Sequence, residues 1–367
     1  MTTQFLHLSS VAKQIELLGK TNTFLVEGQP GIGKSAILHG LDGSKYKKFR
    51  LDCARIQDSA DVLFPFVDID EKTVKFVIVG MLAGLMDAIK AGEPVALMLD
   101  ELGKAPRVAM NALITLLVDR YIDQYALPEG SLVFATTNLS TDGVGDNIPA
   151  HIYNRMTTVK CCGPTVKEWM MYAARKNISP ALIAWANNTH EAFDTYAMGT
   201  RTNSGIPAED NKYIFRPTDS QLSKFFCSPR SLEMASSIVE SRSHLTEEEF
   251  SAALAGTVGT AAAASIQTYI TFADTLPPFE EVVNNPTTTR VPTGVPALVS
   301  AIILATRLTP ENGDALITYV GRFDTDEPKA LFTSMMGYDP YKNGWLAKNK
   351  KFAEMTSMIS SQILLTR

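Results

Sequence analysis

The chain has 367 residues, enough for two or three domains. Hydrophobic residues make up 45% and charged residues 20%, which excludes a disordered chain and indicates an ordinary globular protein. The net charge of −5 indicates that the protein is not built mainly to coat nucleic acid, although a local basic channel stays compatible with it.

We expect a cytoplasmic protein without a membrane segment. Residues 1–10 lack the basic start and apolar core of a signal peptide. The longest apolar runs, Val77–Ile89 and Val295–Thr306, are too short to cross a bilayer. The four cysteines form no CxxC pair, which is typical of reduced core thiols.

The first 163 residues alternate between expected strands and helices. The expected strands are Thr23–Glu27, Lys48–Asp52, Pro94–Asp100, Ser131–Thr136 and Met156–Cys161, and the expected helices are Gly33–Gly40, Met81–Ala91 and Arg107–Leu117. Hairpins are expected within Val62–Val79 and Arg120–Leu127. Such alternation predicts an α/β fold, a mainly parallel sheet with helices on both faces.

After Gly163 the pattern predicts helices alone. They are expected at Thr165–Lys176, Ser179–Asn188, Pro229–Glu240 with Ser228 as N-cap, Thr246–Leu254, Ala261–Ala273, Ala297–Leu308, Glu311–Phe323, Glu327–Met336 and Lys350–Leu365. A loop is expected at Tyr196–Thr218, and five prolines within Thr275–Pro296 mark a boundary. We therefore expect an α/β core at 1–163, a helical domain at 164–275 and a helical extension at 276–367.

One stretch matches the phosphate-binding pattern GxxxxGK[ST]: Gly28-Gln29-Pro30-Gly31-Ile32-Gly33-Lys34-Ser35. It lies between an expected strand and an expected helix, the context in which this loop binds phosphate. Glycines let backbone N–H groups point at phosphate oxygens, and the helix N-terminus adds positive charge. Lys34 would then reach the β- and γ-phosphates, and the Ser35 hydroxyl would ligate Mg²⁺.

Polar side chains follow two of the expected strands at their carboxyl ends. Asp100 and Glu101 end one strand, and Asn138 follows another. Ligands of open parallel sheets bind at this edge. Asp100 would hold Mg²⁺, directly or through water, Glu101 would polarise the attacking water, and Asn138 would hydrogen-bond the γ-phosphate and that water.

Two arginines are candidates for stabilising the charge that develops in phosphoryl transfer. Arg155 lies just before the last expected strand, and Arg230 follows Ser228-Pro229 at the start of a helix. A guanidinium offers planar, paired donors to phosphate oxygens.

Taken in order, the segments GQPGIGKS, LMLDE, ATTN, the Asn154-Arg155 turn and SPR resemble the signature of AAA+ ATPases, most closely the MoxR-like members. The resemblance covers about Thr23–Ser241. It implies a five-stranded core, a helical lid and a hexameric ring that binds Mg²⁺ and ATP at subunit interfaces.

The resemblance also implies roles residue by residue. Lys34 and Ser35 match the Walker A pair, Asp100 and Glu101 the Walker B pair, Asn138 sensor 1, Arg155 the finger given to a neighbouring subunit, and Arg230 sensor 2. The chain departs from the family in two places: Asn154 replaces the usual acidic residue, and Leu-Ser follows Asn138 instead of Asn-Pro. Arg120 is a second candidate for the contact in trans.

MoxR-like proteins resemble chaperones that remodel other proteins, often with a partner that carries a von Willebrand factor A domain, and this is the function we expect. One alternative is a nucleic-acid motor or loader, although nucleic acid is not the expected partner. This alternative rests on the basic and aromatic stretches Lys45–Arg50 and Lys342–Lys351. Another is a nucleotide-gated scaffold with little turnover, which the intact Glu101 disfavours.

Overall fold

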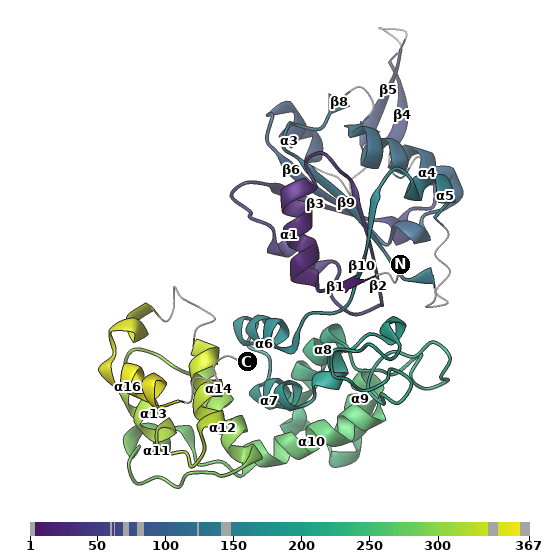
Figure 1. Cartoon of the computed structure of the whole chain (residues 1–367). Helices are drawn as coiled ribbons and strands as arrows, with labels where there is room; N and C mark the ends of the chain where they lie inside the picture. The colour runs from purple at the N-terminus through teal and green to yellow at the C-terminus, as the bar shows by residue number, and fades with distance from the viewer. Residues whose placement is uncertain are drawn as a thin grey trace.

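The computed structural model describes residues 4–58, 61, 63–68, 73–78, 84–122, 125–140, 148–336 and 344–359. Within these ranges the strands all precede Gly163, and only helices and loops follow it. Figure 1 shows the sheet with its helices in the upper part of the molecule and the later helices below it. The predicted α/β class with a helical continuation is confirmed.

A parallel sheet of six strands forms the centre of the first part, one strand more than expected. In spatial order the strands are β1 (Phe5–Leu6), β10 (Thr157–Cys161), β2 (Phe24–Gly28), β9 (Leu132–Thr137), β6 (Val95–Asp100) and β3 (Lys47–Asp52). The additional strand, β1, pairs with β10 through only two residues. Two residues are too few for an alternating pattern, so the sequence did not indicate it.

The strands alternate their side chains between two apolar layers, as a period of two residues requires. Leu25 of β2 packs in a cluster with α3 (Leu85–Lys90) and α4 (Arg107–Ile114). Its neighbours on the strand pack with α1 (Leu8–Leu18) and α2 (Ala36–Gly40). Helices therefore cover both faces, and this explains why β2 reads as a continuous apolar run.

Two hairpins accompany the sheet, both in predicted segments. The first joins β4 (Leu63–Asp68) to β5 (Thr73–Ile78), and the second joins β7 (Tyr121–Ile122) to β8 (Tyr125–Ala126). In Figure 1 the first hairpin projects from the core on the side away from the later helices. The predicted start of the helix at Met81 lies outside the described residues.

The helices of the second part lie close to the predicted positions, except for the one at Phe279–Asn284, which falls in the stretch Thr275–Pro296 where we expected a boundary and no helix. They are α6 (Val166–Arg175), α7 (Pro180–Asn188), α8 (Pro229–Glu240), α9 (Glu247–Val258), α10 (Thr260–Asp274), α11 (Phe279–Asn284), α12 (Val295–Thr306), α13 (Gly313–Val320), α14 (Asp326–Met336) and α16 (Lys350–Met358); α5 (Ala150–Tyr153) belongs to the first part. Ser228 caps α8 through the Ser231 N–H, and Thr246 caps α9 in the same way through Glu249. These capping boxes explain where both helices begin.

One apolar core spans the proline-rich stretch at which we expected a boundary. Trp185 of α7 and Ile266 of α10 share a cluster with Ile302 of α12 and Met335 of α14. A second cluster joins α11, α13 and α16. We therefore describe the helices on both sides of residue 275 together, and the domain limits stay a prediction.

All four cysteines are buried and free, as predicted for core thiols. In the described part of the chain, no helix combines the length and the apolar character that crossing a membrane requires.

Candidate phosphate-binding site

The loop Gly28–Ser35 connects β2 to α2, and its glycines are sterically required. Gly31 and Gly33 have φ values of +80° and +96°, which L side chains rarely adopt. A Cβ at Gly28 would lie 2.6 Å from the Cys161 sulfur, and a Cβ at Gly31 would lie 2.8 Å from Ser228 Oγ. The loop is thus folded tightly against both β10 and the start of α8.

Lys34 turns back over its own loop and is almost fully buried, with 8% of its surface exposed. Its ammonium donates to the Gly28 carbonyl, to the Gln29 carbonyl at 3.0 Å and to Asn138 Oδ1 at 3.0 Å. Asn138 is itself buried just beyond β9. The structure thus brings together two predicted site residues that are more than a hundred positions apart in the sequence.

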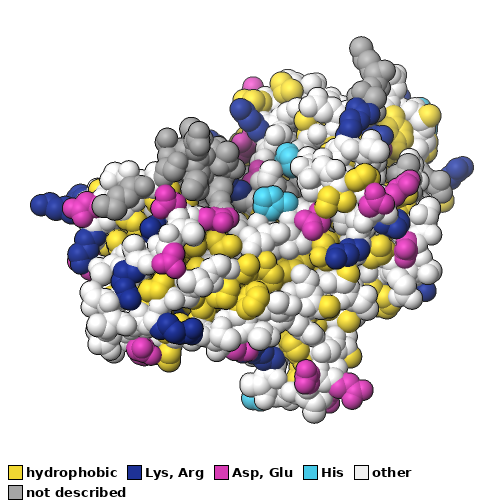
Figure 2. Space-filling model, turned by 60° about the horizontal axis from the view of Figure 1, so that its bottom comes forward, with side chains coloured by type: hydrophobic (Ala, Val, Ile, Leu, Met, Phe, Trp, Pro, Cys, Tyr) yellow, Lys and Arg dark blue, Asp and Glu magenta, His cyan; other side chains and the backbone are white. Residues whose placement is uncertain are grey.

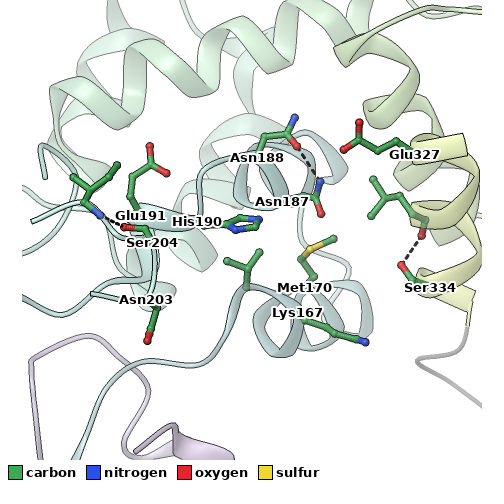
Figure 3. Close-up of a pocket in the computed structure, with 13 residues that line it drawn as sticks. Lys167, Met170, Asn187, Asn188, His190, Glu191, Asn203, Ser204, Glu327 and Ser334 are labelled. Carbon is green, nitrogen blue, oxygen red and sulfur yellow. Dashed lines mark hydrogen bonds between the residues drawn. The ribbon is translucent and has the colours of Figure 1, made fainter. Parts of the chain in front are cut away.

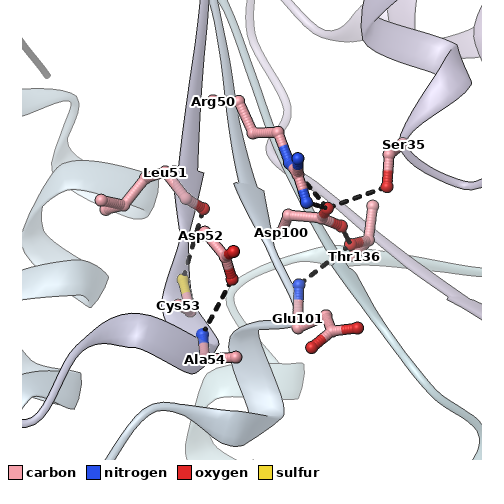
Figure 4. A network of polar contacts seen from close by, with 9 residues as sticks. All are labelled: Ser35, Arg50, Leu51, Asp52, Cys53, Ala54, Asp100, Glu101 and Thr136. Carbon is pink, nitrogen blue, oxygen red and sulfur yellow. Dashed lines mark hydrogen bonds and ion pairs between the residues drawn. The ribbon is translucent and has the colours of Figure 1, made fainter. Parts of the chain in front are cut away.

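Asp100 is the centre of a polar network at the carboxyl end of β6 (Figure 4). Ser35 Oγ donates to Asp100 Oδ2 at 2.8 Å, and Thr136 Oγ1 donates to Oδ1. Arg50, on the neighbouring β3, reaches the same Oδ2 with Nε at 2.9 Å and with a terminal nitrogen at 2.6 Å. The structure therefore brings the two predicted metal ligands, Ser35 and Asp100, into direct contact.

Sequence reasoning missed Arg50 and Thr136 as members of this network. Arg50 was assigned to a basic stretch, although its place two residues before the end of an expected strand was a signal. Thr136 lies two residues before Asn138, inside a strand that reads as buried. A buried threonine needs a hydrogen-bond partner, and that requirement was the available signal.

The environment of Asp100 keeps its carboxylate ionised. Burial raises the pKa of Asp100, but hydrogen bonds from Thr136 and Ser35 and the guanidinium of Arg50 outweigh burial and hold the pKa below its usual value. A negatively charged carboxylate therefore lies beside the Ser35 hydroxyl at this edge of the sheet.

Glu101 takes a left-handed backbone conformation, with φ of 54°. This conformation is uncommon for a residue other than glycine and turns the chain sharply after β6. The Glu101 N–H donates to Thr136 Oγ1 at 3.2 Å. Its carboxylate points away from the contact between Arg50 and Asp100 (Figure 4). Adjacent acidic residues thus face different surroundings.

The loop also touches the helical part of the protein. Gln29 Oε1 accepts a hydrogen bond from the Tyr196 N–H at 3.1 Å, and the Gly31 carbonyl accepts one from the Arg230 N–H at 3.3 Å. The main chain of Arg230 therefore lies against the loop, while its side chain is exposed. Segments on both sides of Gly163 meet at this point.

Arg155 lies at the opposite end of the sheet from the loop. In the pairing of β10 with β2, Cys161 is opposite Gly28, whereas Thr157 is opposite Phe24. Six residues of chain separate Arg155 from Cys161, which at a strand's rise places Arg155 about 20 Å away. The exposed Arg155 therefore does not reach the loop of its own chain.

Arg120, our second candidate for a contact in trans, is already engaged inside the chain. Its guanidinium donates to the carbonyls of Gly19, Lys20 and Ser131 at 2.6, 2.6 and 3.0 Å. Gly19 is the C-cap of α1 and Lys20 follows it, so the guanidinium lies at the carboxyl end of the helix, where a cation is favourable. Burial also lowers the pKa of Arg120. The structure thus assigns Arg120 to a helix cap, a role that the sequence did not indicate.

The basic stretch that suggested nucleic-acid binding is engaged in local contacts. Lys45 pairs with Asp42, Lys47 with Glu93 and Arg50 with Asp100, and Lys48 donates to the His39 carbonyl. Tyr46 is buried, and Phe49 packs against the core, so neither ring offers a free face for stacking. Figure 2 shows acidic and basic side chains interspersed over the coloured part of the face it presents. Residues 342 and 343 of the second basic stretch lie outside the described residues.

A separate cavity of about 690 Å³ lies among the helices after residue 163 (Figure 3). Its described lining comes from α6, the end of α7, the loop around Asn203 and Ser204, and α14. None of the predicted site residues is among the described residues that line it. The cavity is therefore distinct from the phosphate-binding loop.

The residues at the loop fit a nucleotide and its metal. Ser35 and Asp100 supply adjacent oxygen ligands, the donor type that Mg²⁺ prefers. Lys34 supplies a cation beside glycines whose positions leave no room for a Cβ at Gly28 or Gly31. The arrangement can hold a polyphosphate with a divalent cation.

No protein-family model matches the sequence, and no curated protein matches it either. Similar solved structures include NtrX from Brucella abortus in complex with ADP, at 17% identity over 71% of this chain and 65% of that one, with a TM-score of 0.31. The RuvB Holliday junction branch migration motor of Thermotoga maritima is 13% identical over 77% of this chain and 74% of its own, with a TM-score of 0.34. Hsp104 with ATPγS and FITC casein is 13% identical over 47% and 38%, with a TM-score of 0.33.

The chain thus spans less than two thirds of the NtrX and Hsp104 chains it matches. At these identities and TM-scores the likeness says nothing about activity, substrate or assembly.

Proposed function

We propose that this protein is an ATP-hydrolysing AAA+ machine that binds Mg-ATP at the loop Gly28–Ser35. The observation that carries the proposal is the convergence of Lys34, Ser35, Asp100 and Asn138 at the carboxyl ends of three parallel strands. Such a convergence of a cation, a hydroxyl, a carboxylate and an amide beside a glycine-rich loop has no evident purpose in folding.

Each residue has a distinct part in this proposal. Lys34 and the loop N–H groups bind the phosphates, and Ser35 and Asp100 hold Mg²⁺, which supplies charge neutralisation when it is bound. Glu101 takes its position from the left-handed turn and orients the attacking water. Asn138, held beside the loop by its bond from Lys34, would hydrogen-bond the γ-phosphate.

The position of Arg155 supports a ring in which neighbouring subunits complete each other's sites. Arg155 is exposed at the far end of the sheet from its own loop, so its guanidinium is free to act on the nucleotide of a second copy. An arginine supplied in trans accelerates phosphoryl transfer by about 10³–10⁵-fold in enzymes that use one. The contact between the main chain of Arg230 and Gly31 supports a role for Arg230 at the nucleotide of its own subunit.

The finer part of the proposal is a MoxR-like machine that remodels a protein partner, with a von Willebrand factor A domain protein as a candidate. It rests on the ordered motifs and on SPR at the start of α8. The nucleic-acid motor finds less support, because the stretch Lys45–Arg50 is engaged in contacts within the chain.

The test is steady-state ATP hydrolysis together with equilibrium binding of ADP. Lys34→Ala should abolish binding, whereas Glu101→Gln should keep binding and lose hydrolysis, because only the water-polarising carboxylate is removed. Glu129→Gln, a matched change at an exposed position, should alter neither. Normal hydrolysis by Lys34→Ala would contradict the assignment of the site. Loss of binding in Glu101→Gln would contradict the separate role of that carboxylate.

A further inference from the structure

The contact between Arg50 and Asp100 occupies the oxygen that the proposed metal needs. Arg50 places two nitrogens on Asp100 Oδ2, at 2.9 and 2.6 Å, and Ser35 Oγ donates to the same atom at 2.8 Å. Thr136 occupies the other carboxylate oxygen. A carboxylate oxygen offers about two lone-pair directions, so three donors already saturate Oδ2.

Arg50 and a divalent cation therefore compete for one atom. Ionised carboxylates bind guanidinium groups and metal ions through the same lone pairs. Ser35, the second proposed metal ligand, is attached to that oxygen as well. A metal bound directly by Ser35 Oγ and Asp100 Oδ2 requires at least one Arg50 nitrogen to leave Oδ2.

The two partners differ in how easily they can move. The side chain of Asp100 is 4% exposed, whereas that of Arg50 is 48% exposed. Arg50 can therefore turn its guanidinium into solvent, whereas the buried carboxylate of Asp100 needs a positive partner, which the incoming metal supplies. Asp100 stays in place through its bond from Thr136.

We propose that Arg50 is a positioning residue that holds Asp100 ready in the metal-free site and is exchanged for Mg²⁺ when the nucleotide arrives. This inference rests on the proposed function, because it takes Asp100 and Ser35 as the metal ligands. The guanidinium stays near the phosphate loop throughout, since it and the Ser35 hydroxyl contact the same oxygen.

Two opposite effects follow from removing the charge of Arg50. Metal-free nucleotide binding weakens, because the positive charge of the guanidinium, which contacts the same oxygen as the Ser35 hydroxyl, is lost beside the loop. Mg²⁺ binding strengthens, because its competitor and a repelling charge are lost. At a separation of about 5 Å in a solvent-like dielectric, one unit of charge is worth roughly fourfold in each equilibrium.

The test is fluorescence titration with mant-ADP, first in EDTA and then with increasing Mg²⁺ at fixed nucleotide. Arg50→Gln should weaken ADP binding in EDTA by roughly fourfold and lower the half-saturating Mg²⁺ concentration by a similar factor. Arg50→Lys, which keeps the charge but cannot place two nitrogens on one oxygen, should fall between wild type and Arg50→Gln.

Lys48→Gln is the matched control. Lys48 lies two residues earlier on β3, on the same face, and donates to the His39 carbonyl instead of to Asp100. It removes one positive charge from the same strand and should leave both titrations unchanged. Circular dichroism of each variant checks that the fold is retained.

The outcomes separate the two proposals. If wild-type protein binds no ADP, the proposed function fails. If wild type binds ADP but Arg50→Gln shifts both titrations in the same direction, or neither, Arg50 only supports the structure and the inference is overturned. If Arg50→Gln does not fold, an Arg50→Lys variant with wild-type Mg²⁺ dependence overturns it as well.

Discussion

Replacing Gly31 by alanine tests the contact between the phosphate loop and the helical part. At φ of +80° an alanine costs about 1–2 kcal/mol of backbone strain. Its Cβ would also lie 2.8 Å from Ser228 Oγ and 3.0 Å from Ser228 Cβ, so Ser228 must move. Ser228 caps α8, and losing a serine cap costs about 1 kcal/mol. We expect Gly31→Ala to lower the free energy of unfolding by about 2–3 kcal/mol.

A double-mutant cycle separates the clash from the backbone strain. Ser228→Gly removes both side-chain atoms that the new Cβ would meet, and glycine is tolerated at an N-cap for a few tenths of a kcal/mol. In urea unfolding, Gly31→Ala combined with Ser228→Gly should therefore cost about 1 kcal/mol less than the sum of the single changes.

Gly33→Ala provides the matched control cycle. Gly33 has φ of +96°, yet the nearest atom to its Cβ is 3.5 Å away and belongs to Leu8. Gly33→Ala should be strained but additive with Ser228→Gly. Additivity in both cycles would refute the claim that the loop packs directly on the cap of α8.

Three further outcomes are expected. Arg155→Ala should abolish ATP hydrolysis and leave ADP binding nearly intact. Mixing Arg155→Ala subunits with Lys34→Ala subunits should restore some hydrolysis, and absence of this rescue would count against a role in trans. Arg120→Met should lower the free energy of unfolding by about 2–4 kcal/mol, because its hydrogen bonds to carbonyls are lost, and should leave the affinity for ADP unchanged. A loss of ATP hydrolysis without a loss of stability would point instead to a contact in trans. The pKa of His7 is raised from 6.5 to about 9, chiefly by its hydrogen bond with Cys162. Protonated His7 therefore stabilises the fold fully below about pH 6.5, and this contribution is lost as the pH rises through 9. The difference in unfolding free energy between wild type and His7→Gln should shrink across that interval, and a constant difference would refute the shift.

Local patterns in the sequence were enough to predict the α/β class and most helix starts. Ser228 and Thr246 predict where their helices begin, because a capping side chain and its N–H partner are only three residues apart. The loop Gly28–Ser35 is recognised in the same way, since the glycines, the lysine and the serine of its pattern lie within eight consecutive residues. Interactions of this range are encoded locally, so a single sequence reveals them.

Contacts between distant segments were decided by the tertiary structure. The sequence indicates that Arg50 belongs to a basic stretch and that Arg120 is a candidate for a subunit contact. In the structure, Arg50 pairs with Asp100, and Arg120 donates to carbonyls at the end of α1. A long cationic side chain reaches any of several neighbours, and only the packed sheet determines which acceptor is near. The order of the strands is also decided by the tertiary structure. β3 and β6 are neighbours in the sheet but far apart in the chain, and their register brings Arg50 to Asp100.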